Sequence, residues 1–382
     1  MQPWAEVEWD LIVVGAGPAG SSAARVAAEH GASVLLLDRA TFPRYKTCGG
    51  GLIGISIDNV PASVLATVEQ RITRVRFTLR GRAASTHRSR RPFLSLVQRD
   101  RFDQALVDTA VAAGVTFRDG VSVKGIADDA AGVTVTTSEG EFTARTVIGA
   151  DGAGGRIGRH VGVTPGGVDL ALEHDILRPV SGDWSDRVFL DWGPEPGTYA
   201  WMFPKEKALT VGVIQRRGEP DQTRAYLDAY TKGLHLDGAE ITRSSGHLAQ
   251  WRTAGSPLRK GNVIVAGDAA ALLDPFTREG ISFALRSGGW AGEAAASAKT
   301  DGAALDGYVQ RVERELAPDI AAGEKLLRLF ERRPGLVHAG LAFSIVGARI
   351  FERVCRGELT LSQLFRWPGA RVLRYLLRTP TE

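Results

Sequence analysis

Short apolar runs and one helical repeat alternate at the start of the chain. Residues 10–14 and 33–37 are apolar runs of strand length, and residues 18–30 between them are alanine-rich with helical spacing. Strand, helix and strand in this order predict a βαβ unit, which builds a parallel sheet. Further buried elements are predicted over residues 101–113 (helix), 262–266 (strand) and 279–299 (a glycine- and alanine-rich helix).

The middle of the chain instead alternates apolar and polar residues, which is the pattern of half-buried strands. This alternation predicts an antiparallel sheet separate from the parallel one. From residue 302 onward the spacing is helical, with breaks at prolines. The alternating segments are residues 75–79, 188–190, 199–203 and 209–214, and the breaks are Pro318, Pro334 and Pro368.

A glycine-rich turn joins the first predicted strand to the first helix. Its spacing, Gly15-x-Gly17-x-x-Gly20, is typical of a dinucleotide site, because glycines allow a tight turn, close approach of a pyrophosphate and close helix packing. The helix N-terminus would direct its unpaired N–H groups at the phosphates. Asp38 ends the second strand, where a carboxylate can bind ribose hydroxyls. The expected contacts here are Gly15, Gly17, Ala19, Gly20, Asp38 and Arg39.

Three distant segments favour a flavin over a nicotinamide. Gly267-Asp268 and a Gly-Ala-Asp-Gly turn containing Asp151 each follow a predicted buried strand, and Arg99 precedes a predicted helix. In this order the segments resemble the fingerprints of the p-hydroxybenzoate hydroxylase superfamily of FAD enzymes. The resemblance implies that Asp268 holds the ribitol or ribose region of FAD and that Arg99 lies near the pyrophosphate.

Two further motifs narrow the resemblance. The sequence of residues 46–52 is KTCGGGL, and that of residues 199–205 is YAWMFPK. They look like the K-x-C-G-G-G and Y-x-W-x-F-P-K motifs of the geranylgeranyl reductase family, and three later segments match its G-D-A-A-G, D-P and G-E-G-I segments. The similarity extends over about residues 8 to 300. It implies a flavoprotein that reduces isolated C=C bonds, typically of prenyl chains on lipids, quinones or chlorophyll precursors.

The expected fold is therefore α/β, with an α+β substrate part. It combines a Rossmann-like FAD-binding domain with a substrate domain on the antiparallel sheet and a helical C-terminal region. The FAD-binding domain is expected to comprise residues 8–72, 99–165 and 255–300, the substrate domain residues 73–98 and 166–254, and the helical region residues 301–382.

The aromatic residues of the second motif fall on one face of their strand, because side chains alternate along a strand. Tyr199, Trp201 and Phe203 would then either cover an isoalloxazine ring and guide an apolar chain, or form the core side of the sheet. Lys205 after them is either catalytic or a solvated strand end.

Cys48 precedes three glycines, which permit close approach of flavin or substrate. Its thiol is either a proton source for the reduced product or a small buried apolar group. Further FAD contacts are expected from Cys48, Gly49, Arg99, Asp151, Gly267, Asp268, Pro275, Gly280 and Ile281, and substrate contacts from Gly50, Gly51, Tyr199, Trp201, Phe203 and Phe276.

The chain departs from the family at Arg278, which replaces the first glycine of G-E-G-I. A guanidinium is always charged and suits carboxylate or phosphate. Arg278 would therefore favour anionic reduced flavin or hold an acidic substrate, unless it points to solvent. With Cys48, Tyr199 and Trp201 it completes the candidate catalytic set. The chain after about residue 299 is also short for finishing a long lipid tunnel.

Composition limits the kinds of binding partner and the cellular compartment that we expect. Cys48 and Cys355 are the two cysteines and make neither a disulfide framework nor a zinc cluster, so no metal site is expected. No basic signal segment precedes the first strand, and the apolar residues 335–348 are too few to span a bilayer. We expect a cytoplasmic protein without a nucleic-acid partner. Residues 323–382 hold eleven Lys or Arg against five Glu, so a membrane-surface contact is the alternative to a solvated basic face.

Two functions compete. In the first, reduced FAD gives hydride to a C=C bond of a prenyl or other apolar substrate, and a side chain gives the proton. In the second, the enzyme is a monooxygenase that hydroxylates an aromatic small molecule through a C4a-hydroperoxide. A halogenase, whose W-x-W-x-I-P segment has only a partial match at residues 201–204, and a non-catalytic FAD or lipid carrier are further alternatives. No second dinucleotide motif follows a later strand, so NAD(P)H docks transiently or a protein donor supplies electrons.

Overall fold

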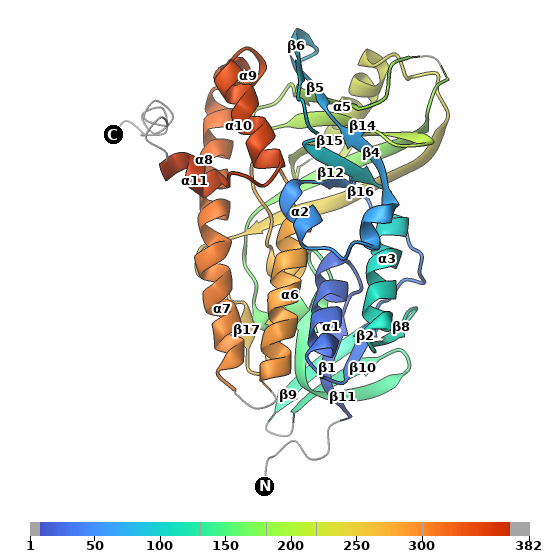
Figure 1. Ribbon diagram of the computed structural model, residues 1–382, viewed down its shortest axis with the longest axis vertical. Coiled ribbons are helices and arrows are strands. Elements are labelled where there is room, and N and C mark those ends of the chain that lie inside the picture. The colour runs from blue at the N-terminus through green and yellow to red at the C-terminus, as the bar shows by residue number, and fades with distance from the viewer. Residues whose placement is uncertain (1–7, 130–131, 181, 219, 299–301, 367–382) are drawn as a thin grey trace.

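The computed structural model describes residues 8–129, 132–180, 182–218, 220–298 and 302–366. Figure 1 shows one β-sheet in the lower part of the molecule and another in the upper part, with long helices beside both. The two sheets predicted from the two kinds of hydrophobic pattern are confirmed as separate layers.

The lower sheet has eight strands and contains the predicted βαβ unit. Strands β1 (Trp9–Val14) and β2 (Val34–Leu37) are parallel neighbours joined by helix α1 (Pro18–Glu29). Every residue of β2 is buried, as expected for a parallel strand covered on both faces. The other strands are β8 (Thr116–Arg118), β9 (Val123–Asp129), β10 (Gly132–Thr137), β11 (Gly140–Gly149), β17 (Arg259–Lys260) and β18 (Val263–Val265).

Close helix packing explains the glycine- and alanine-rich composition of helix α6 (Ile281–Ser297). A Cβ at Gly288 would lie 2.1 Å from the carbonyl oxygen of Ala19, and one at Gly292 would lie 2.2 Å from that of Ala23. Helices α1 and α6 can therefore touch only because α6 has no side chains at these positions. The other helices on this sheet are α3 (Arg99–Ala112) and α4 (Arg156–Val161).

The upper sheet has seven strands in the order β16-β12-β15-β14-β13-β5-β6. The predicted antiparallel arrangement is confirmed, with one parallel pair, β13 with β5, because β5 comes from an early segment of the chain. The strands are β5 (Arg74–Leu79), β6 (Arg82–Arg88), β12 (Pro165–Leu177), β13 (Arg187–Trp192), β14 (Tyr199–Pro204), β15 (Ala208–Arg216) and β16 (Ile241–Arg252).

Several elements were not predicted, because their apolar faces are narrow or their runs short. Helix α5 (Pro220–Gly233) covers the upper sheet through Tyr226 and Leu227. A three-stranded sheet lies between the two large ones. It and its neighbours comprise β3 (Gly51–Leu52), β4 (Val68–Ile72), β7 (Leu94–Val97), α2 (Gly54–Asp58) and a 3-10 turn (Val64–Thr67).

The described C-terminal part is helical, as predicted. Pro318 and Pro334 each lie in the first turn of a helix, where proline is tolerated because its missing N–H needs no partner, and Pro368 lies outside the described residues. No single described helix is long and apolar enough to cross a bilayer; α9 and α10 pass that test only as a pair bent by 87°. The helices are α7 (Ala304–Glu315), α8 (Ala317–Arg332), α9 (Pro334–Ala342), α10 (Ile345–Cys355) and α11 (Leu361–Arg366).

Candidate active site

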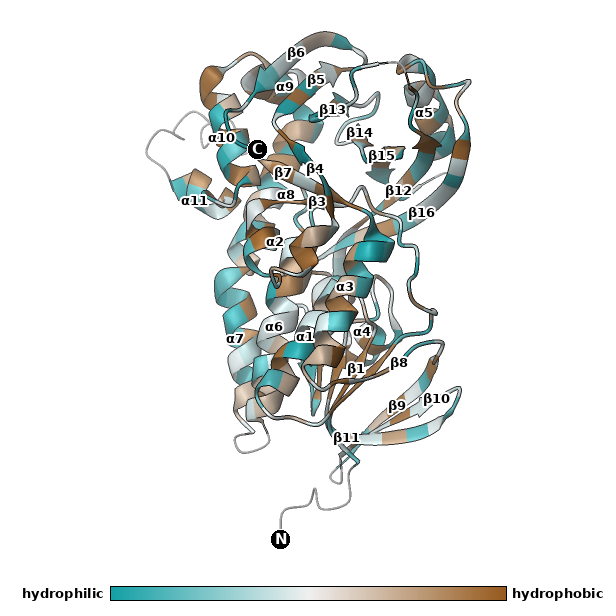
Figure 2. Ribbon diagram, turned by 45° about the vertical axis from the view of Figure 1, so that its right-hand side comes forward, coloured by the Kyte–Doolittle hydropathy of each residue, from teal (hydrophilic) through white to brown (hydrophobic). Residues whose placement is uncertain are grey.

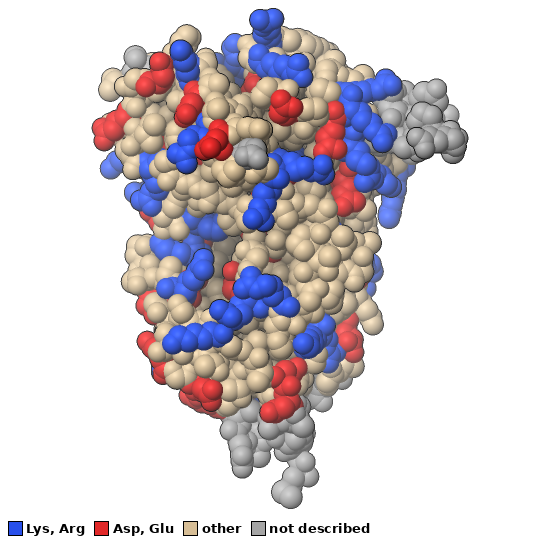
Figure 3. Space-filling model, turned by 180° about the vertical axis from the view of Figure 1, so that it is seen from behind, with Lys and Arg blue, Asp and Glu red and all other residues tan. Residues whose placement is uncertain are grey.

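A cavity of about 1270 Å³ lies between the two sheets and extends to the C-terminal helices. One ligand usually occupies roughly 300–1,000 Å³, so this cavity has room for a cofactor and a substrate together. Seen from behind, the surface is hollowed between the two parts of the molecule, and Lys and Arg side chains gather beside the hollow (Figure 3). Arg39, Arg156 and Arg159 line the cavity and are exposed.

The glycine turn at the start of α1 forms an open cradle at one end of the cavity. Gly15 has a φ of +100°, and a Cβ at Gly20 would lie 1.7 Å from the Gly15 carbonyl oxygen, so these two glycines shape the turn. Gly17 differs, because a Cβ there would meet only the Nη2 atom of Arg44, at 3.4 Å. No side chain caps α1, so its first N–H groups remain available to a phosphate.

The side chains around this turn fit a dinucleotide. Asp38 accepts hydrogen bonds from the N–H groups of Ala16 (2.8 Å) and Ala40 (2.9 Å) and faces the cavity. Arg44 pairs through Nη2 with Asp103 at 3.0 Å, while its buried Nη1 has no hydrogen-bond partner among the described residues. A buried, unpartnered guanidinium nitrogen beside an open glycine turn is what a pyrophosphate would satisfy.

Arg99 lines the same cavity in a fixed orientation. It forms a bidentate ion pair with Asp103, with both N–O distances at 2.8 Å. Burial alone would lower the pKa of Arg99, but the carboxylate of Asp103 raises it. Arg99 is therefore a permanent cation whose charge is already partly balanced.

Three predicted cofactor contacts do not line the cavity. Gly20 supports the turn, Gly267 lies beneath helices α1 and α6, and Pro275 packs against α8, where a Cβ at Gly323 would lie 2.7 Å from its ring. Each is needed for backbone packing instead. The predicted contacts that do face the cavity are Gly15, Gly17, Ala19, Asp38, Arg39, Cys48, Gly49, Arg99, Asp151, Asp268, Gly280 and Ile281.

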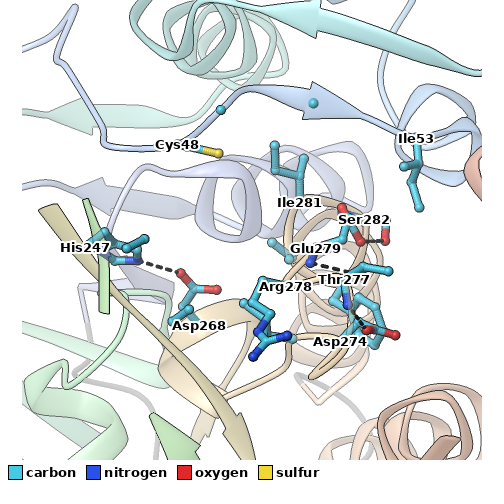
Figure 4. Close-up of a pocket in the computed structure, with 18 of the residues that line it drawn as sticks. Cys48, Ile53, His247, Asp268, Asp274, Thr277, Arg278, Glu279, Ile281 and Ser282 are labelled. Atoms are coloured by element: carbon cyan, nitrogen blue, oxygen red, sulfur yellow. Dashed lines mark hydrogen bonds and ion pairs between the residues drawn. The ribbon is translucent and has the colours of Figure 1, made fainter. Parts of the chain in front are cut away.

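Asp268 follows β18 and is paired with a histidine from the upper sheet. The Nε2 atom of His247 on β16 lies 3.5 Å from Asp268 Oδ2 (Figure 4). Burial would raise the pKa of Asp268, but the neighbouring His247 and the charge of Lys46 lower it overall. Burial lowers the pKa of His247. Asp268 is thus an ionised carboxylate at the point where the two sheets meet.

A loop from Asp274 to Gly280 brings a buried and a half-buried carboxyl group, those of Asp274 and Glu279, to the cavity (Figure 4). Asp274 accepts hydrogen bonds from the N–H groups of Phe276 and Thr277, and burial raises its pKa to about 6. Glu279 caps α6 by accepting from the N–H group of Ser282 at 2.7 Å, and burial raises its pKa to about 7. Both groups therefore exchange protons near neutral pH.

These raised pKa values predict a pH-dependent stability. In the unfolded chain both groups ionise near pH 4 to 5, so between about pH 5 and 7 the folded protein binds more protons. The free energy of unfolding should therefore fall as pH rises through this window. Glu279→Gln should remove on the order of 2 kcal/mol from this decrease in the free energy of unfolding between about pH 5 and 7. The decrease is measured by urea unfolding at a series of pH values. Glu29→Gln, on the surface of α1, is the matched control, and an equal change in both variants would contradict the assignment.

Arg278 is neither free nor turned to solvent. Its side chain is 5% exposed and donates from Nε (2.9 Å) and Nη2 (2.7 Å) to Asp169, which is 2% exposed. It also donates to the carbonyl oxygens of Phe276 and Gly197. Its φ is +56°, the left-handed region that favours glycine, which agrees with the family's glycine at this position. The alternative that Arg278 points to solvent is therefore wrong, and Asp169 balances its charge beside the cavity.

The aromatic strand forms one wall of the cavity. Tyr199, Trp201 and Phe203 on β14 all line it, while Ala200 and Met202 point to a separate core with α5. Tyr199 donates a hydrogen bond from its hydroxyl to the carbonyl oxygen of Thr277 at 2.8 Å. Trp201 is also a core residue, because the backbone of Gly212 approaches its ring so closely that a Cβ would lie at 2.2 Å. Trp201 therefore lines the cavity and belongs to the core at the same time.

Cys48 and the glycines after it face this wall. The Cys48 thiol accepts a hydrogen bond from the Gly50 N–H group at 3.4 Å and is half-buried in the cavity. A Cβ at Gly49 would lie 2.8 Å from the Phe203 ring, so glycine here lets the wall pack against the loop. Lys205 is neither a solvated strand end nor a cavity residue, since it is buried and contacts Gln98.

The far end of the cavity is apolar and is built by the C-terminal helices. Helices α8 to α11 turn back over the cavity and contribute to its lining, although the chain after residue 299 is short. Phe276 lies on the boundary and packs edge-on against Phe330 of α8. The apolar lining from these helices comprises Leu326, Leu329, Leu336, Val337, Leu341, Val346, Ile350, Phe351, Val354, Leu361 and Leu364.

Comparison with known proteins agrees with this geometry. Residues 8–309 match the family model described as FAD binding domain. Digeranylgeranylglycerophospholipid reductase 1 of Methanopyrus kandleri is 32% identical over 342 residues, which is 81% of this chain and 87% of the relative. Geranylgeranyl diphosphate reductase of Rhodobacter capsulatus is 30% identical over 302 residues, 76% of this chain and 75% of the relative. The chain belongs to the geranylgeranyl reductase family of FAD-dependent oxidoreductases.

The fold of this reductase-family member has a close counterpart among solved structures. A geranylgeranyl bacteriochlorophyll reductase-like protein from Thermoplasma acidophilum superposes with a TM-score of 0.81 over 96% of this chain and 99% of the other. Their sequence identity is 22%, so this match supports the fold alone.

Several site residues of this family member were missed by the sequence analysis. They are His247, Glu279, Asp169 and Glu173. Glu279 starts a predicted helix, whereas the other three lie on β12 and β16, outside the alternating segments named in the sequence analysis. Glu173 accepts from the Tyr45 hydroxyl and from the Cys48 N–H group, both at 2.8 Å, and so holds the Cys48 loop. The signal available was the presence of acidic residues within an otherwise apolar strand, since a buried charge needs a partner.

Proposed function

We propose that this protein reduces C=C bonds of a prenyl chain with hydride from reduced FAD. The observation that carries the proposal is the continuity of one cavity, which joins the glycine cradle to an apolar end walled by aromatic and aliphatic side chains. A prenyl chain is long and apolar, so an apolar lining binds it by burial of surface. The two reductases reported above are named for substrates with such chains.

The residues of the chain divide the work. The glycine turn at Gly17 and the carboxylate of Asp38 would hold FAD, and bound FAD would supply the hydride. Tyr199, Trp201 and Phe203 orient the chain and exclude water, since their rings form the wall between cradle and apolar end. The Cys48 thiol is the proposed proton donor, because it lies in the cavity opposite this wall. The reductant is either NAD(P)H docking transiently or a protein electron donor.

The function is tested by anaerobic turnover. The FAD-loaded protein is reduced with dithionite and mixed with a geranylgeranyl lipid, and the product is analysed by mass spectrometry. We expect a gain of two hydrogens for each reduced bond. An unchanged prenyl substrate in this assay, together with oxygen consumption matched to hydroxylation of an aromatic compound in a parallel aerobic assay with NAD(P)H, would instead support the monooxygenase.

Trp201→Phe tests the role of the aromatic wall without creating a large cavity in the hydrophobic core. Phenylalanine keeps most of the packing against Gly212 but removes part of the wall, so we expect kcat/KM to fall by about tenfold or more, about 1.4 kcal/mol. The matched control is Trp251→Phe, because Trp251 is equally buried but does not line the cavity. Equal losses of thermal stability and of activity in both variants would mean that Trp201 is a core residue only.

A further inference from the structure

Four large hydrophobic side chains are exposed on α9 and at its junction with α10. They are Leu336 (41% exposed), Phe343 (60%), Ile345 (73%) and Val346 (57%), and we call them the apolar elbow. Figure 2 shows this hydrophobic stretch at the outer edge of the upper part. Clustered exposed apolar residues mark a contact surface, whereas isolated ones do not.

The elbow is held in place by the fold. Ser344 caps α10 by accepting from the Gly347 N–H group at 3.2 Å, and a Cβ at Gly347 would lie 1.8 Å from the Gly340 carbonyl oxygen. Two histidines join it to the upper sheet, because His338 contacts the carbonyl oxygen of Ala83 and His87 that of Ala342. The apolar residues are therefore presented on a braced scaffold.

The cavity reaches the surface at the elbow. Leu336 and Val346 line the cavity and are exposed, so they lie at its rim. Phe343 and Ile345 are exposed without lining it, so they point outward beside the opening. An apolar chain could pass from the elbow into the cavity without leaving an apolar surface.

Arginines surround the elbow. Arg332 and Arg333 precede α9, and Arg349 lies on the second turn of α10. Arg80 and Arg82 lie at the β5–β6 turn, next to Ala83, whose carbonyl oxygen His338 contacts. All five are exposed, and none forms an ion pair with an acidic residue in the described part of the chain. Exposed, unpaired cations on the segments that adjoin an apolar tip match an anionic lipid surface, where the tip enters the acyl region and the cations meet phosphates.

We propose that the apolar elbow docks the protein on anionic lipid bilayers and is the entrance through which a membrane-held prenyl chain reaches the cavity. The proposed docking depends only on the exposed residues of the elbow and its surroundings, whereas the proposed entrance rests on the proposed function.

Docking is tested by co-sedimentation of the FAD-loaded protein with vesicles. Binding is expected to vesicles of phosphatidylcholine mixed with phosphatidylglycerol, to be weaker with phosphatidylcholine alone, and to weaken with salt. The variant Phe343→Ser with Ile345→Ser should bind roughly tenfold more weakly for each side chain replaced. The matched control is Leu177→Ser with Ile241→Ser, which removes two other exposed apolar side chains (48% and 47% exposed) from the opposite edge of the upper sheet. Equal binding by both variants, or no binding by the natural protein, would overturn the docking.

Two readouts separate this inference from the proposed function. The elbow variant should reduce a short, water-soluble prenyl alcohol as fast as the natural protein, but should lose most activity on a long prenyl lipid held in vesicles. Vesicle binding without reduction of either substrate would refute the function and leave the docking intact. Light scattering tests whether the elbow instead binds a second copy of the chain. If the natural protein is a dimer, the elbow variant is a monomer and vesicle binding is unaffected, a second copy covers the elbow and the docking is refuted.

Discussion

Gly17→Val is expected to abolish FAD binding while leaving the fold in place. A Cβ at Gly17 meets only the flexible end of Arg44, so valine is accommodated by the protein but occupies the space that the pyrophosphate needs. The same branched side chain also hinders access to the first N–H groups of α1. We expect the Kd for FAD to rise by more than about 100-fold, about 2.7 kcal/mol.

The measurement is titration of the FAD-free protein with FAD, followed by fluorescence quenching, together with circular dichroism of the unfolding transition. Gly238→Val is the control, because a Cβ at Gly238 meets no atom within 4 Å and the residue does not line the cavity. Gly20→Val should fail differently, by disrupting the turn itself, since its Cβ would lie 1.7 Å from the Gly15 carbonyl oxygen. A full complement of FAD in purified Gly17→Val would contradict the assignment of the glycine turn to FAD binding.

Loss of the Arg278 side chain is expected to destabilise the protein by about 3 kcal/mol. Arg278→Gly relieves a left-handed backbone conformation, which is worth about 1 to 2 kcal/mol. It also leaves the Asp169 carboxylate buried without its counter-charge, which costs about 3 to 5 kcal/mol. The second effect is the larger, so the net change is a loss.

A double-mutant cycle isolates the pair. Arg278→Gly combined with Asp169→Asn should recover most of the loss in urea unfolding, because no uncompensated charge remains. Asp306→Asn at the exposed pair of Arg259 and Asp306 is the control and should change the free energy of unfolding by less than about 1 kcal/mol. Because the double variant keeps the net charge of the site, the reduction potential of bound FAD should stay constant. Additive losses in the cycle would show that the two side chains do not interact.

Local pattern was enough to predict the parts of the site that neighbours in sequence create. The turn from Gly15 to Gly20 was predictable because β1, the turn and α1 are adjacent, and a glycine that lets a helix approach a strand has few other uses. The face shared by Tyr199, Trp201 and Phe203 was predictable because alternation along a strand is a property of the backbone. The FAD cradle and the aromatic wall thus followed from the sequence.

Contacts between distant segments were not predictable in the same way. Arg278 meets Asp169 across 109 residues, and His247 meets Asp268 from a different sheet, so no local period indicates either partner. The helical pattern after residue 302 was equally compatible with helices leading away from the cavity or back over it.

The sequence by itself determined the two kinds of sheet, the dinucleotide turn, the aromatic face and the family. Each of these depends on the spacing of residues within one element or across one turn, which the chain carries locally. Only the tertiary structure decided that Asp169 neutralises Arg278, that Glu279 titrates near neutral pH, and that the C-terminal helices close an apolar end and expose the elbow. These features depend on which elements pack together and how far they exclude water, and burial is a property of the assembled fold.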